Sequence, residues 1–366
     1  MNDMGEKYPV PRDEAGFRFT GSWTEFLPIA LTNLLLTIVT LGIYRFWAKA
    51  RERRYLWNRT FFVDDSFEWT GTGLEMLIGF LIVMLVLLPA FLFFNFGAQA
   101  LLLRGQWISA AVLSFAFYLG IFYLINVARF RAIRYRLSRS YWHGIRGGSD
   151  DGGWSYGWSA TLKMGAALLA LGLLVPWAMT RLWNERWGKM SFGPYRFEAD
   201  ASSSGLLGRW LLIYLSPIVA LIAATVLGFS GAMMGSAAGG SERVAAGAVV
   251  GIIIGVMFFY LAFLLLSLSF YAAFFRHVAA ATSIGPLRFE FSARTRNWLG
   301  LILGNIGLVI VTLGLGLIFL SYRNWKFIVE HLHVVGDVDL AELTQSTTHA
   351  PGEAEGLADA FDIGAI

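Results

Sequence analysis

The sequence has no cysteine and few charged residues. Without a Cys among the 366 residues, disulfide bonds, thiolate metal sites and cysteine nucleophiles are excluded. Charged residues make up 15% of the chain and hydrophobic residues 56%, whereas a soluble domain carries roughly 25% charged residues. The composition therefore predicts an integral membrane protein.

Motifs that support enzymatic or nucleotide chemistry are missing too. The sequence contains no GxxxxGK[ST] phosphate loop and no HExxH zinc motif. The glycine-rich stretch GAMMGSAAGG lies between two apolar runs and is typical of a connector. We predict no cofactor, no metal and no catalytic residue.

The two ends of the chain differ from its middle. Residues 1–16 are polar and lack the apolar region of a signal peptide, so we expect a disordered N-terminus. From Asp337 to Asp362 there are seven acidic and no basic residues, and we expect residues 344–366 to form a disordered acidic tail. Residues 17–343 are predicted to form one membrane domain.

The middle of the chain contains seven apolar runs. They cover residues 27–44, 74–96, 107–128, 162–180, 206–229, 244–275 and 298–320. Most of them end in a cluster of aromatic and basic residues, as in TLGIYRFWAKARERR from Thr40 to Arg54. Basic residues beside apolar segments face the cytoplasm and attract anionic lipids, so the pI near 9.3 does not indicate nucleic-acid binding.

These runs belong to a predicted internal repeat. Five windows of twelve residues share Leu at position two, and four share Gly at position three; they end at Arg51, Arg129, Arg181, Arg276 and Arg323. A strand-like tag precedes each apolar unit: FRFTG, FEWTG, RFEAD, RFEFS and the degenerate WSYGW. The predicted unit is a short strand, an apolar stretch and an aromatic-basic exit.

Three units contain a single short run, and their path sets the topology. If every run spans, the 29 Lys and Arg divide 16 to 13 between the two faces; if the short runs turn back, they divide 27 to 2. The positive-inside rule favours the second division, while run length favours spanning. Gly42, Gly172 and Gly314 occupy one repeat position and could break these helices. We expect a mainly α-helical fold with four to seven spans and short β-strands on the cytoplasmic side.

The segment LLLTIVTLGIYRFWAKARERRYLWNRTFF, followed by FEWTGTGLEMLIG, resembles the signature of the YjgN-type bacterial inner-membrane proteins. The similar motif covers about fifty residues, and the spacing of the apolar runs fits along most of the chain. The WSYGW tag and the long Gly-Ser loop before it depart from the pattern. The resemblance implies a multi-pass inner-membrane location, and it supplies no activity or catalytic residues.

Polar residues inside apolar runs are the first functional candidates. Asn33, Lys163 and Asn305 each lie seven residues before one of the short-unit windows, which predicts equal depth in the membrane. They could line a polar path, or they could join helices by hydrogen bonds worth about 0.6 kcal/mol each. We favour the second interpretation.

The five window-ending arginines are candidates for interfacial lipid binding, although orientation alone would also explain Arg51, Arg129, Arg181, Arg276 and Arg323. Two further sets of residues are weaker candidates, because each also has a purely structural explanation. A metal site at His331, His333, Asp337 and Asp339 competes with a solvated strand edge. An acid/base set at Glu68, Glu198 and Glu290 competes with ion pairs to arginines of the same sheet, which we favour.

Two functions follow from these patterns. The first is transport or lipid handling along a path between repeats, by analogy with repeat-built transporters. The second is a non-transporting scaffold that organises lipids or partner proteins at the cytoplasmic leaflet. Membrane lipids are the expected partners and nucleic acid is not. A homo-oligomer and a small-molecule substrate of unknown identity stay open.

Overall fold

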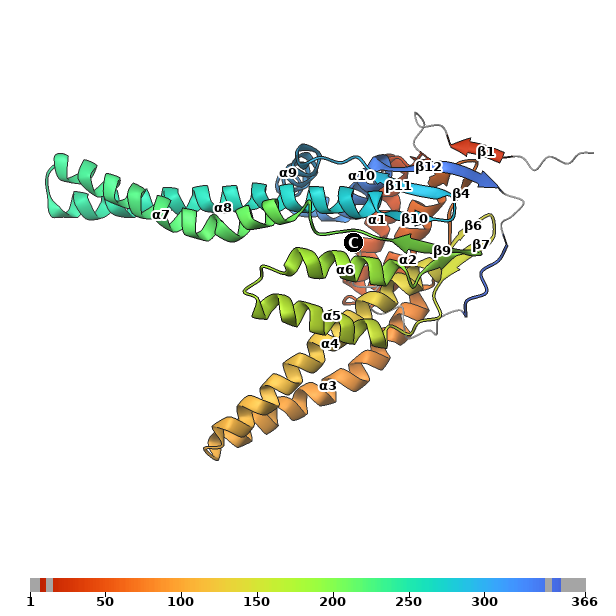
Figure 1. Cartoon of the computed structure of the whole chain (residues 1–366), viewed down its shortest axis with the longest axis horizontal. Helices are drawn as coiled ribbons and strands as arrows, with labels where there is room; N and C mark the ends of the chain where they lie inside the picture. Colours follow the sequence, from red (N-terminus) through yellow and green to blue (C-terminus); the bar gives the residue numbers. More distant parts are fainter. Residues whose placement is uncertain (1–6, 11–15, 340–343, 350–366) are drawn as a thin grey trace, which may run out of the picture.

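The computed structural model describes residues 7–10, 16–339 and 344–349. It is mainly helical, with four long helices that pair into two antiparallel hairpins: α3 Gly73–Leu103 with α4 Trp107–Arg139, and α7 Leu207–Ala237 with α8 Ser241–Ala280. In Figure 1 these two long hairpins leave the sheet as separate arms. Their 31 to 40 residues exceed the roughly 20 needed to cross a bilayer.

The long helices expose their apolar side chains. In the most apolar window of each, between 6% and 17% of residues are buried, so a solvent other than water must cover the rest. Within the second hairpin, glycines allow very close contact: a Cβ atom at Gly231 would lie 2.0 Å from the Gly247 carbonyl oxygen. Such small-residue packing is typical of helix pairs in membranes, where close contact replaces hydrophobic burial.

The three short runs each form a pair of helices rather than one continuous helix. We call these the short hairpins; they consist of α1 Trp23–Val39 with α2 Arg45–Asn58, α5 Trp154–Leu169 with α6 Val175–Trp187, and α9 Thr295–Val311 with the 3₁₀-helix η1 Leu315–Phe319 and α10 Leu320–His331. Figure 1 shows α5 and α6 ending well short of the tip of α7 and α8.

The same turn ends the first helix of every short hairpin. At the first, the N–H of Gly42 donates to Thr37 O at 2.7 Å and that of Leu41 to Ile38 O at 3.1 Å, which is a Schellman cap. The equivalent bonds form at the Leu-Gly pairs 171–172 and 313–314. All three leucines and all three glycines have positive φ. The predicted break at the three glycines is therefore confirmed.

Twelve strands form two antiparallel sheets in the described part of the chain. One has nine strands in the order β1-β12-β11-β10-β9-β8-β7-β6-β5, and the other has the order β2-β3-β4. Their bounds are β1 Lys7–Val10, β2 Phe17–Phe19, β3 Thr60–Phe62, β4 Asp65–Ser66, β5 Glu68–Trp69, β6 Ser140–Trp142, β7 Ile145–Gly148, β8 Ser191–Phe192, β9 Tyr195–Ala199, β10 Thr282–Ile284, β11 Leu287–Phe291 and β12 Leu332–Asp339. Four of the five predicted tags thus contain a strand.

The fifth tag, WSYGW, was wrongly predicted as a strand, because Trp154 begins α5. Gly153 has a φ of +79° and its N–H donates to Asp151 Oδ1 at 2.6 Å, which turns the chain into the helix. Trp154 and Trp158, one helical turn apart, both pack on Tyr123. Residues four apart lie on the same face in a helix and also in a strand, where every second residue points the same way. The spacing of Trp154 and Trp158 therefore fits both structures, and here it belongs to a helix.

Both predicted disordered ends contain contacts where the structure describes them. Lys7–Val10 pair with β12 as strand β1. Near the other end, Gln345 accepts from the Arg146 N–H at 3.1 Å and donates to Gly144 O at 2.8 Å. The rest of both predicted segments lies outside the described residues.

The core lies between the sheets and the membrane helices and joins the first unit to the last. Trp57 of α2 stacks on Trp325 of α10 with ring centroids 4.1 Å apart. The Tyr322 hydroxyl donates to Gly21 O at 2.9 Å, next to the fully buried Phe26. This packing fixes α1 and α2, which carry the basic pocket described below.

Candidate functional site

Asn33, the first predicted polar residue, is buried between α1 and α2. Its side-chain nitrogen donates to Ala48 O at 3.2 Å, and its oxygen accepts from Arg51 Nη1 at 3.4 Å. Arg51 also donates to the Tyr44 hydroxyl at 3.2 Å. The side chain therefore joins the two helices of its own hairpin.

Asn305 repeats this arrangement in the last short hairpin. Arg323 Nε donates to Asn305 Oδ1 at 2.7 Å, and the Asn305 nitrogen donates to Asn324 Oδ1 at 3.0 Å. In both hairpins the arginine follows the asparagine by 18 residues. Two predicted sets, intramembrane polar residues and interfacial arginines, thus meet in one contact.

Lys163 departs from this pattern, because the arginine at the equivalent position, Arg181, has the same charge and cannot pair with it. Arg181, 18 residues later, is exposed, and Lys163 Nζ instead forms an ion pair with Glu185 Oε2 at 2.6 Å. Ser159 bonds both groups. An ion pair therefore joins the two helices of the middle hairpin, whereas a hydrogen bond between an asparagine amide and an arginine guanidinium joins those of the other two.

The five predicted arginines do not form one uniform ring. Arg51 and Arg323 join helices, whereas Arg276 Nη1 donates to Ala293 O at 2.8 Å. Arg129 and Arg181 are exposed.

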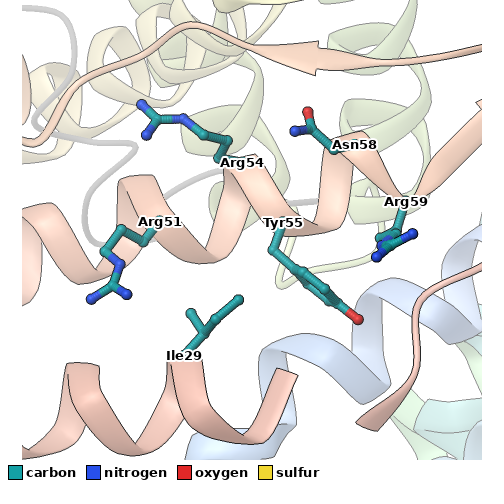
Figure 2. A pocket seen from close by; sticks show the side chains of 6 residues that line it. All are labelled: Ile29, Arg51, Arg54, Tyr55, Asn58 and Arg59. Atoms are coloured by element: carbon teal, nitrogen blue, oxygen red, sulfur yellow. The ribbon is translucent and has the colours of Figure 1, made fainter. Parts of the chain in front are cut away.

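A basic pocket lies beside Arg51. This open hollow of about 460 Å³ is lined by Ile29 of α1 and by Arg51, Arg54, Tyr55, Asn58 and Arg59 of α2 and its end. Figure 2 shows Arg51 and Tyr55 on the side of α2 that faces Ile29, and Arg54 and Asn58 on the other side. The spacing i, i+4, i+8 places Arg51, Tyr55 and Arg59 along one row of the helix, and Arg54 and Asn58, at i+3 and i+7, along the adjacent row.

Charges in the pocket are partly compensated. Arg59 Nη2 lies 3.1 Å from Glu25 Oε2 in an ion pair whose side chains are both 44% exposed. Tyr55 donates to Ser22 O at 2.9 Å. Burial, together with the hydrogen bond to Glu25, raises the pKa of Tyr55 to about 12, so its hydroxyl is neutral at ordinary pH. Arg54 has no side-chain partner within the described residues.

A second hollow of about 290 Å³ adjoins the first and shares Arg54 and Asn58 with it. Its other lining residues are Ser66, Glu68, Trp69 and Thr70. The side-chain amide nitrogen of Asn58 donates to Phe67 O and to Arg54 O. The combined surface has cationic donors at one end and a carboxylate with hydroxyls at the other.

Sequence reasoning found Arg51 and missed the rest of the pocket. Arg54, Tyr55, Asn58 and Arg59 stood in the quoted basic cluster, but their clustering was attributed to membrane orientation. The helical spacing from Arg51 to Arg59 was the available signal. Glu25 carried no signal, because its contact with Arg59 depends on how α1 and α2 pack.

The weaker candidates have other contacts. Within the described residues, Glu68, Glu198 and Glu290 have no ion pair, so the favoured pairing with sheet arginines was wrong. His331 contacts Phe327 O and the Asn297 amide, and His333 contacts the Ser292 hydroxyl. In the described part of the chain, no three His, Asp or Glu side chains lie close enough together to hold a metal ion. The Asp339 side chain lies outside that part.

Comparison with known proteins gives a family and one distant relative. Residues 14–360 match the family model described as "Bacterial protein of unknown function (DUF898)". The inner membrane protein YjgN of Salmonella typhimurium is 26% identical over 129 residues, which are 34% of this chain and 33% of that protein. The match thus spans about a third of this curated relative. No solved structure matches the chain.

Proposed function

The chain belongs to the DUF898 family of bacterial proteins, and from this membership and the geometry above we propose a lipid-organising function without transport. In this proposal the protein is a multi-pass protein of the inner membrane, the location printed for the YjgN relative. Its long hairpins cross the bilayer, and its repeated short hairpins enter only the cytoplasmic leaflet and arrange the lipids there.

The observation that carries the proposal is the shared turn of the short hairpins. Leu41, Leu171 and Leu313, at the three tips, are 94%, 74% and 94% exposed, so these tips need an apolar surrounding. From Asn33 to Leu41 the helix rises about 12 Å, close to half of a bilayer core of roughly 30 Å. A hairpin of this depth reaches the middle of the membrane from one side.

The charge distribution supports the same topology. If only the long hairpins cross, Arg104 and Arg243 are the two basic residues on the far face and the other 27 of 29 lie on the cytoplasmic side. A further support for repetition is the recurrence of the turn and of the Asn-Arg contact at equal spacing. We therefore keep the internal repeat, with its strands on the cytoplasmic side, as part of the proposal.

The polar side chains favour a scaffold over a transporter. A transport path needs polar groups that face a cavity, yet Asn33, Lys163 and Asn305 each bond to the partner helix of their own hairpin. Among the described residues, the main contacts between long helices lie within each hairpin, α3 with α4 and α7 with α8, and not between the two hairpins. Lipid can therefore fill the space between the arms.

The test uses oriented proteoliposomes with spin-labelled phospholipid in one leaflet at a time. We expect more motionally restricted lipid per protein in the cytoplasmic leaflet, because the three short hairpins add helical surface that contacts lipid there. Equal numbers in the two leaflets, or protein-dependent solute flux into sealed vesicles, would contradict the proposal. A fluorophore on Leu171→Cys adds depth: quenching should be strongest with lipids brominated near the ends of their acyl chains.

A further inference from the structure

The two adjoining hollows beside α2 carry opposite charges at opposite ends. Arg54 lies at their junction, because it lines both. Arg51 and Arg59 belong to the first hollow only, and Glu68 to the second only. Neither Arg54 nor Glu68 has an ion-pair partner within the described residues, and both side chains are exposed. An unpaired cation and an unpaired anion on one continuous surface fit a zwitterionic ligand.

We propose that this surface binds the headgroup of a phospholipid with a primary ammonium group, of the phosphatidylethanolamine type. The phosphate lies at Arg54, with Arg51 and Arg59 contributing positive potential, and the ammonium lies at Glu68. This assignment gives the lipid class for the lipid-organising function proposed above and rests on it.

The arginines at the cationic end provide the hydrogen-bond donors that a phosphodiester group needs. A guanidinium offers two parallel N–H donors to phosphate oxygens. The Arg54 guanidinium has no competing side-chain acceptor. Arg59 is shared with Glu25 at 3.1 Å, and one Arg51 nitrogen is used by Asn33 and Tyr44. One fully available arginine and two partly used ones match a phosphate with a single charge.

The acidic end suits a primary rather than a quaternary ammonium. A primary ammonium has three N–H donors, and the second hollow offers acceptors at Glu68, Ser66 and Thr70. Quaternary ammonium groups are instead bound on aromatic faces. Trp69 lines this hollow, but the Arg53 guanidinium already lies 5.0 Å from its ring centroid.

The position of the surface fits a lipid whose acyl chains enter the cytoplasmic leaflet. Arg51 and Arg54 follow the Leu41 tip by 10 and 13 residues. The return helix α2 begins at Arg45, so Arg54 lies about 14 Å along that helix toward the cytoplasm. With the tip near the middle of the membrane, Arg54 reaches phosphate depth, and Glu68 and Asn58 lie further outward, as an ammonium does.

The experiment is native mass spectrometry of the full chain in detergent with phosphatidylethanolamine, phosphatidylglycerol or phosphatidylcholine added. We expect wild-type protein to retain phosphatidylethanolamine best. Arg54→Gln should lower the retention of every phospholipid about tenfold, a loss of about 1.4 kcal/mol. Glu68→Gln should leave phosphatidylglycerol unchanged and lower the preference for phosphatidylethanolamine about threefold.

Matched variants and a soluble probe make each outcome decisive. Arg104→Gln in the far loop and Glu198→Gln at the equivalent place in strand β9 should change nothing. A preference for phosphatidylglycerol, or equal loss in Glu68→Gln and Glu198→Gln, would overturn the headgroup assignment. Competition by soluble phosphoethanolamine at concentrations that match the lipid would overturn the membrane source. The proposed function would still stand after either of these results if the cytoplasmic leaflet contained more motionally restricted lipid than the other leaflet.

Discussion

The ion pair between Lys163 and Glu185 gives the sharpest test of whether polar residues in the short hairpins join helices. Lys163 Nζ lies 2.6 Å from Glu185 Oε2, and the two side chains are 25% and 24% exposed. Lys163→Met leaves Glu185 with Ser159 and with Lys189, whose nitrogen is 4.0 Å from its carboxylate. We expect this single substitution to destabilise the protein, because a carboxylate would lose its close counter-charge.

The magnitude lies between two limits. Breaking a fully buried pair costs about 3–5 kcal/mol, and an exposed pair contributes about 0–1 kcal/mol. With about three quarters of each side chain covered, we expect about 2 kcal/mol for Lys163→Met and for Glu185→Met. The double variant should cost much less than their sum, since it leaves no unpaired charge, and the coupling energy should be about 2 kcal/mol.

The assay is a double-mutant cycle on the unfolding free energy in lipid-detergent micelles, followed by tryptophan fluorescence. The pair Lys326–Glu330 on α10 is the matched control, because its atoms are 3.6 Å apart and its side chains are 45% and 52% exposed. Its coupling should stay below about 0.5 kcal/mol. If the Lys163–Glu185 coupling were equally small while solute flux changed, these residues would line a path instead of joining helices.

Three further predictions concern the turns, the long hairpin and pH. Gly172→Ala should destabilise by about 1–2 kcal/mol because φ is +85° there, whereas Leu171→Gly, at a φ of 53°, should be neutral or stabilising; thermal unfolding compares them, and equal effects would contradict the αL argument. Gly231→Ala should separate α7 from α8 and reduce cross-linking between engineered cysteine pairs, while Gly120→Ala, with nothing within 4 Å, should leave it unchanged. Because the folded pKa of Tyr55 is raised to about 12 from 10.0, its stabilising contribution is complete below pH 10 and lost as pH rises toward 12; Tyr55→Phe should remove this part of the alkaline loss, and an unchanged pH profile would count against it.

The helix breaks and the paired helices were readable from the sequence because they depend on local chemistry. Gly42, Gly172 and Gly314 recur at one position, and a glycine at positive φ is a strong helix-ending signal. Hydropathy and length marked the four long helices. Two things misled the sequence reading: the strand tag at Trp154, and the three glutamates assigned to ion pairs. Both depend on which element packs opposite, which a single sequence does not encode locally.

The candidate site was only partly predictable for the same reason. Asn33, Lys163 and Asn305 each lie on the first helix of a short hairpin, eight residues before the leucine of the turn. Their common position followed from the spacing in the sequence, but their partners did not. Arg51 and Arg323 were in the windows, whereas Glu185 lies 22 residues after Lys163 instead of 18. The basic pocket needs Glu25 of α1 to hold Arg59 of α2, and the adjoining acidic end comes from strand β5. Only the packed structure brings these segments together.

The sidedness of single cysteines tests the one-sided entry of the short hairpins most directly, and the chain has no cysteine of its own. Cysteines would replace Ser66, Asp150, Ser202 and Ser292 in the connections between hairpins, and Gln106 and Ser241 at the far ends of the long hairpins. An impermeant maleimide should label the first four from the cytoplasmic side and the last two from the opposite side. If Ser66 and Asp150 were labelled from one side and Ser202 and Ser292 from the other, α5 and α6 would cross the membrane, and the topology proposed here would be wrong.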